Sequence, residues 1–133
     1  MTLILALMAF SDPVLANPIT AQENYIVHCQ GCHGADGKGL PSVVPGFSAE
    51  LAQILLTPGG REYLIRVPGV AMAPISDADL AGVLNWVVKR YLEPDLSTRI
   101  NEFNAQEVGA SRNPPLDQPE RIRRRLIAQG GGS

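Results

Sequence analysis

The chain is poor in several residue types, and each scarcity excludes a class of protein. It has two cysteines and two histidines among 133 residues, all between positions 28 and 33. Structural zinc sites usually draw ligands from two separated clusters, and a second cluster is missing. The net charge of −2 and the pI near 5.6 favour neither nucleic acid nor an anionic membrane surface as a partner. No apolar run approaches the ~20 residues that cross a bilayer, so we expect no membrane span in the mature chain.

Alternating apolar and polar residues, the pattern of a half-buried strand, are also scarce, so the sequence predicts an all-α protein. Thr20 and Glu23 form a capping box that starts a helix leading to Cys29. Ser48 is expected to cap a short helix that ends before Pro58.

Two further helices are expected in the middle of the chain. A short one covers 61–67 and ends at Pro68, and 70–75 is expected to be loop. Ser76 and Asp79 then cap a long helix. Its apolar residues recur every three or four positions and form one stripe: Leu80, Val83, Leu84, Val87, Val88 and Tyr91.

The two ends of the chain are expected to lie outside the main domain. Residues 1–16 resemble a secretory signal peptide, with an apolar run over 3–10 and small residues at the cleavage position. Residues 17–92 are predicted to form the domain, and 93–133 a partly helical C-terminal extension. In that extension Asn104 and Asp117, each followed three positions later by glutamate, are predicted N-caps, and 130–133 a flexible end.

The short sequence Cys29-Gln-Gly-Cys32-His33 carries the chemistry of the chain. Cys-x-x-Cys-His is the attachment motif of c-type haem. Two thiols one helical turn apart can add to the two vinyl groups of a haem, and the following imidazole then binds the iron as the proximal ligand. Two alternatives are weaker: a thioredoxin-like redox pair requires a βαβ pattern, and a zinc site formed by His28, Cys29, Cys32 and His33 lacks a second cluster.

The order of features from about Thr20 to Tyr91 resembles the class I cytochromes c, the small bacterial single-haem electron carriers. The resemblance implies one covalently bound haem c, with Cys29 and Cys32 as thioether positions and His33 as an iron ligand. It also suggests Met72 as the second iron ligand, because Met72 lies in a loop 39 residues after His33 and before a capped helix. A buried core methionine is the alternative interpretation.

Two other residues near the motif are interpreted through the same resemblance. Pro45 matches a family proline whose carbonyl accepts a hydrogen bond from the proximal histidine, which orients the ring. A plain turn proline is the alternative. His28 lies five residues before His33 in the attaching helix, so it cannot reach the other face of the same haem, and we interpret it as a partly exposed histidine.

The resemblance implies a periplasmic electron carrier, not an enzyme, that passes single electrons between redox proteins, from a periplasmic dehydrogenase toward a terminal oxidase. Alternatives are an open-site haem protein, such as a peroxidase or gas sensor, and a dedicated subunit of one dehydrogenase. Only two lysines are present, so the lysine ring by which some cytochromes c dock is missing. Arg121, Arg124 and Arg125 are expected on one face of the last helix, as a solvated surface or a docking site for an acidic partner.

Overall fold

The computed structural model describes residues 19–131, and the predicted signal peptide lies outside them. Within these residues the chain forms helices and no strand, which confirms the all-α prediction. The helices of the described range are α1 (Ala21–His28), α2 (Gln30–His33), α3 (Ala49–Leu56), α4 (Gly60–Arg66), α5 (Pro68–Ala71), α6 (Asp77–Tyr91), α7 (Pro94–Ser97), α8 (Ala105–Ser111) and α9 (Pro119–Gly130).

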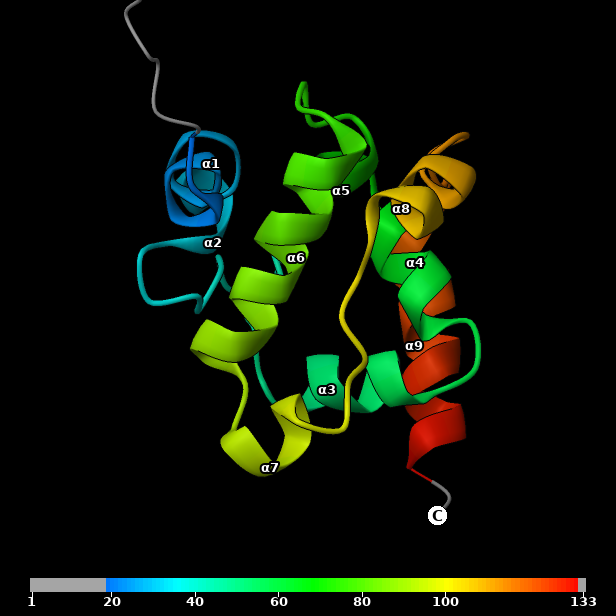
Figure 1. The fold of residues 1–133 in the computed structure, drawn as a ribbon. Helices are drawn as coiled ribbons and strands as arrows, with labels where there is room; N and C mark the ends of the chain where they lie inside the picture. The colour runs from blue at the N-terminus through cyan, green and yellow to red at the C-terminus, as the bar shows by residue number, and fades with distance from the viewer. Residues whose placement is uncertain (1–18, 132–133) are drawn as a thin grey trace, which may run out of the picture.

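Helix α6 is the centre of the fold. It begins at the predicted cap, where Ser76 Oγ accepts a hydrogen bond from the Asp79 backbone N–H at 3.1 Å. Figure 1 shows α1 and α2 on one side of α6, and α4, α8 and α9 on the other. Its apolar stripe packs into the core. The buried members of the predicted stripe are Leu80, Val83, Leu84, Val87 and Val88.

Helix α1 brings the Cys-x-x-Cys-His motif against α6. The predicted capping box is confirmed: Thr20 Oγ1 accepts from the Glu23 N–H, and Glu23 Oε2 accepts from the Thr20 N–H at 2.6 Å. Tyr25, only 1% exposed, packs against Val83 and Val87 of α6. The end of α1, and therefore the motif, is held in place by this contact.

The segment after α4 differs from the prediction. Pro68 ends α4 but also occupies the first position of a new helix, α5, so Val70 and Ala71 are helical and not loop. The reason is local: proline has no N–H to lose at the first helical position, and its fixed φ suits a helix start. The loop before α6 is therefore shorter than expected and begins at Met72.

The C-terminal extension folds back onto the domain through α7, α8 and α9 (Figure 1). Asn104 caps α8 as predicted, with its Oδ1 2.9 Å from the Glu107 backbone nitrogen. Asp117 is not the cap of α9, because Pro119 starts that helix and Gln118 stands at the capping position. Gly130 belongs to α9 and not to a flexible end.

Helix α9 packs on α3 and α4 and forms a small second core with them. Ile122 and Leu126, on one face of α9, lie against Ile54 and Tyr63. Arg123 adds a hydrogen-bonded ion pair with Glu50 at 2.8 Å. Three arginines of α9, Arg121, Arg124 and Arg125, are exposed.

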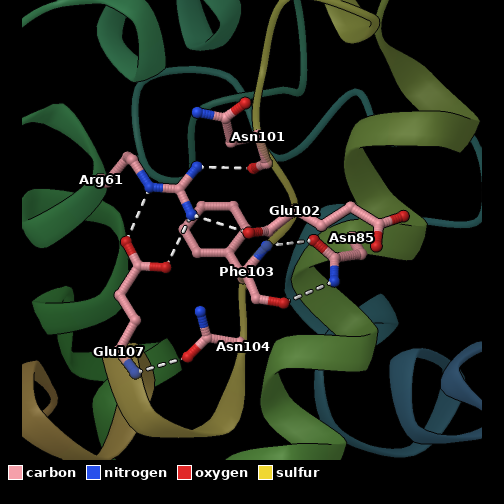
Figure 2. Close-up of polar contacts among 7 residues, drawn as sticks. All are labelled: Arg61, Asn85, Asn101, Glu102, Phe103, Asn104 and Glu107. Carbon is pink, nitrogen blue, oxygen red and sulfur yellow. Dashed lines mark hydrogen bonds and ion pairs between the residues drawn. The ribbon is translucent and has the colours of Figure 1, made fainter.

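A polar network ties the start of the extension to α4 and α6 (Figure 2). The Arg61 guanidinium binds both carboxylate oxygens of Glu107, at 2.7 and 2.6 Å. It also donates to the carbonyls of Asn101 and Glu102 and lies 3.9 Å above the Phe103 ring. Such a bidentate, charge-assisted contact is geometrically specific, so it fixes the path of the chain between α7 and α8.

Asn85 of α6 makes two hydrogen bonds to the backbone of buried Phe103. Its Nδ2 donates to the Phe103 carbonyl at 2.9 Å, and its Oδ1 accepts from the Phe103 N–H at 2.7 Å (Figure 2). Because Asn85→Ala leaves both backbone groups unpaired, we expect it to lower the free energy of unfolding by about 2–4 kcal/mol. Denaturant unfolding of the haem-loaded protein measures this.

Asn101→Ala is the matched control for that prediction. The exposed Asn101 contributes its backbone carbonyl to the network, and that group survives the substitution. We expect a change within about 0.5 kcal/mol, as for an ordinary surface position. Equal losses in the two variants would show that the Asn85 side chain has no special role.

Candidate haem site

The two cysteines and His33 lie at the junction of α1 and α2. Cys29 ends α1, with its N–H donating to the Tyr25 carbonyl at 2.9 Å. The Cys29 carbonyl then accepts from the N–H groups of Cys32 and His33, at 3.2 and 3.0 Å. This single helical turn places the two thiols at the one-turn spacing that attachment to two vinyl groups requires. Gly34 ends the turn with a φ of +75°, a conformation that favours glycine.

The two thiols are free and lie in different surroundings. Cys29 is half-buried against the cluster around Tyr25, and this burial raises the pKa of its thiol. Cys32 is exposed. One thiol therefore faces the domain and the other faces outward. His28 beside them is half-buried and lies on α1.

The His33 ring is held by packing more than by polar contacts. It stacks on the Phe47 ring, with centroids 4.4 Å apart and planes 18° from parallel. Burial lowers the pKa of His33, and the backbone carbonyl of Pro45 opposes this effect, which places that carbonyl close to the ring. Among the described residues, His33 Nδ1 is nevertheless buried without a formed hydrogen bond. Desolvation keeps the ring neutral, the state in which imidazole binds a metal.

The glycine loop after His33 brings Pro45 back to that histidine. The Gly39 N–H donates to the His33 carbonyl at 3.0 Å, and Leu40 and Val44 exchange backbone hydrogen bonds. Gly39 has a φ of +72°, and a Cβ there would lie 2.2 Å from the Val44 carbonyl oxygen. Only glycine fits this approach, so the loop's glycine content has a structural reason.

An aromatic cluster under the motif was not identified from the sequence as part of the site. Tyr25 lies against the rings of Phe47, Trp86 and Tyr91, with centroid distances of 6.3, 4.9 and 5.7 Å. The Tyr25 hydroxyl donates to the Gly34 carbonyl at 2.6 Å, and burial raises its pKa. The Tyr91 hydroxyl donates to the Ala35 carbonyl at 3.0 Å. The chain after His33 is thus anchored to α1 and α6 by two phenols.

Met72 lies on a different segment, directly after α5. Its backbone N–H donates to the Pro68 carbonyl at 3.0 Å, and its side chain is 71% exposed. The neighbours Ala71 and Ala73 are both buried. Met72 is therefore not a core methionine, which removes the alternative interpretation for this residue. Its binding to iron stays a prediction.

The described residues fit a haem. Seven large apolar side chains are exposed within residues 19–131, and five of them lie on the segments that carry the motif, the loop after it and the candidate ligand. These five are Ile26, Val27, Leu40, Val43 and Met72. Exposed apolar clusters usually mark a surface that something covers. The two thiols, which form no disulfide, and the neutral imidazole of His33 agree with a covalently attached, His-ligated haem.

Two observations bear on the other predictions. In the part of the chain that the structure describes, no three His, Cys, Asp or Glu side chains gather as a metal-binding group, which a zinc site would need. No helix among residues 19–131 combines the length and apolarity needed to cross a membrane.

Comparison with known proteins identifies relatives of one kind. Cytochrome c-552 of Thermus thermophilus is 32% identical to this chain over 98 residues, which cover 60% of this chain and 75% of the relative. A second cytochrome c-552, from one particular strain of the same species, shows the same identity over the same length and is covered to 66%. No family model matches the chain, and no solved structure matches it significantly. The predicted cytochrome c fold and its haem c are confirmed by these relatives.

Proposed function

Since the chain belongs to the class I c-type cytochromes, which carry electrons on covalently bound haem c, we propose which residues hold that haem. Cys29 and Cys32 form the two thioether bonds, His33 is one iron ligand and Met72 is the other. The observation that carries this proposal is the helical turn from Cys29 to His33, which combines two free thiols with a neutral, half-buried imidazole. Residues 17–92 form the haem domain, and 93–133 its extension.

When bound, haem c supplies an iron that takes up one electron and gives it up again. The surrounding residues would keep the iron ligands in the same positions in the oxidised and the reduced protein. Phe47 supports one face of the His33 ring, and in the haem-loaded protein we expect the nearby Pro45 carbonyl to accept a hydrogen bond from Nδ1–H. That hydrogen bond would fix the tautomer that leaves Nε2 free for iron. Fixed ligands mean little rearrangement on electron transfer.

Met72 sets the electronic character of the site. A thioether sulfur is a soft ligand, and His/Met ligation raises the reduction potential of haem iron. The side chain projects from a segment whose neighbours on both sides are buried. An exposed methionine between two buried residues is held at its base and can extend its side chain toward a cofactor.

The chain's partners are redox proteins, and we propose the class of contact that they make. Since lysine is scarce, docking would depend on an apolar patch around the exposed edge of the haem. The expected signal peptide supports a periplasmic location. There a dehydrogenase would donate electrons, and a terminal oxidase would accept them. A permanent dehydrogenase subunit is the alternative, because the extension offers further surface for binding a partner.

A visible spectrum of protein produced with haem-attachment machinery tests the ligand assignment. We expect a low-spin c-type spectrum in both oxidation states, a weak red sulfur-to-iron band when oxidised, and no binding of carbon monoxide when reduced. These features report two strong axial ligands. High-spin haem that readily binds carbon monoxide would contradict Met72 ligation and favour a gas sensor.

A further inference from the structure

One arginine of the C-terminal extension forms hydrogen bonds to the backbone on both sides of Met72. Arg112 follows α8 directly, and its guanidinium donates to the carbonyls of Ala71, Ala73 and Ile75, at 3.1, 2.7 and 3.1 Å. It also forms an ion pair with Asp77 Oδ1 at 2.8 Å. The Arg112 side chain is only 12% exposed. One side chain therefore makes four charge-assisted hydrogen bonds to the segment that carries the candidate ligand.

The three backbone hydrogen bonds of Arg112 are made to the carbonyls of every second residue between Ala71 and Ile75. The Met72 peptide lies between the held carbonyls of Ala71 and Ala73, whose side chains are themselves buried. The N–H groups of the stretch donate to carbonyls that lie close by in the sequence, from Met72 to Pro68, from Ala73 to Val70 and from Ile75 to Ala73. Arg112 therefore supplies the hydrogen bonds that connect this stretch to the extension. With the backbone fixed on both sides, the Met72 side chain is directed outward.

From these contacts we propose that Arg112 is a positioning residue for the Met72–iron bond, so that the extension determines how firmly the sixth ligand is held. This inference rests on Met72 being that ligand. Arginine is suited to the role because its planar fork carries five donors in fixed directions. A lysine at this place keeps the charge but offers one nitrogen, which cannot reach three carbonyls and a carboxylate together.

Arg61 of α4 provides a matched control, because it also connects the domain to the extension. It also makes several hydrogen bonds across to the extension, but its partners are Glu107 and the carbonyls of Asn101 and Glu102 (Figure 2). None of these partners lies in the Met72 segment. Arg61→Lys loosens the extension without releasing the carbonyls around Met72, whereas Arg112→Lys releases them.

The test compares haem-loaded wild type, Arg112→Lys and Arg61→Lys. The oxidised proteins are heated while the sulfur-to-iron band and global unfolding are followed separately, and carbon monoxide binding is measured on the reduced proteins. We expect Arg112→Lys to lose the band well below its unfolding temperature and to bind carbon monoxide about tenfold faster, because the ligand-free state is more populated. In Arg61→Lys the band should disappear only as the protein unfolds.

Hydrogen exchange of the peptide covering 70–76 gives a second readout that does not depend on iron ligation. We expect faster exchange there in Arg112→Lys than in Arg61→Lys. The inference is overturned when the band and the unfolding transition move together in Arg112→Lys, by the same amount as in Arg61→Lys. Absence of the band from the wild type is a different result, because it refutes Met72 ligation before any arginine is changed.

Discussion

Replacing Met72 with alanine is expected to convert the reduced protein into one that binds carbon monoxide. The change removes the sulfur and leaves the sixth position of the iron to water or added ligands. The sulfur-to-iron band should vanish. The potential should fall by on the order of 0.1–0.2 V, within the range of about 0.8 V over which axial ligands tune haem. Visible spectroscopy and a redox titration measure both effects.

Two further variants separate ligation from packing in that experiment. Met72→Leu keeps an apolar side chain of similar size without a sulfur, and it should behave like Met72→Ala. Val43→Ala removes a comparably exposed apolar side chain, 76% exposed, and should leave the band intact. A band that persists in both Met72 variants would exclude Met72 as the ligand.

The double substitution Cys29→Ser with Cys32→Ser is expected to abolish covalent haem. Serine preserves the local helical turn but lacks the thiol that forms the thioether bond. Because haem binding stabilises the folded chain, and because five large apolar side chains near the site remain exposed without it, the yield of folded protein should fall on the order of tenfold. Mass spectrometry after denaturation and circular dichroism measure the two effects.

The single cysteine variants are the controls for this prediction. Each keeps one thiol, so each should retain haem through one thioether bond, at lower yield than the wild type. Cys29 is half-buried against the Tyr25 cluster and Cys32 is exposed. The loss of Cys29 should therefore affect haem orientation more than the loss of Cys32. Haem that remains covalently bound in the double variant would show attachment through a different residue.

Local sequence patterns were enough to predict where several helices begin, because helix capping depends on neighbouring residues. Thr20, Ser76 and Asn104 each cap a helix as predicted, since each side chain accepts from an N–H three positions further along. The incorrect predictions have equally local causes. Pro68 and Pro119 each begin a helix, which made 70–71 helical and displaced the cap of α9 from Asp117. The preference of proline for the first helical position outweighed the loop signal around Pro68 and the capping pattern at Asp117.

The residue types of the motif also indicated which cofactor the chain binds. Cys29, Cys32 and His33 are adjacent in the chain, so one turn of helix suffices to arrange them. No long-range contact is needed for that arrangement. The position of Pro45 near His33 was also predicted, by resemblance to the family.

Only the tertiary structure revealed what holds this site in place. The stacking of Phe47 on His33 and the cluster of Tyr25, Trp86 and Tyr91 depend on how α1 crosses α6. Arg112 meets its partners 35 to 41 residues away in sequence. An arginine at a helix end carries no local signal of a partner so distant, because such contacts arise only when the extension packs against α6. The sequence by itself therefore determined the cofactor, and the folded chain decided which residues contact the segments that carry His33 and Met72.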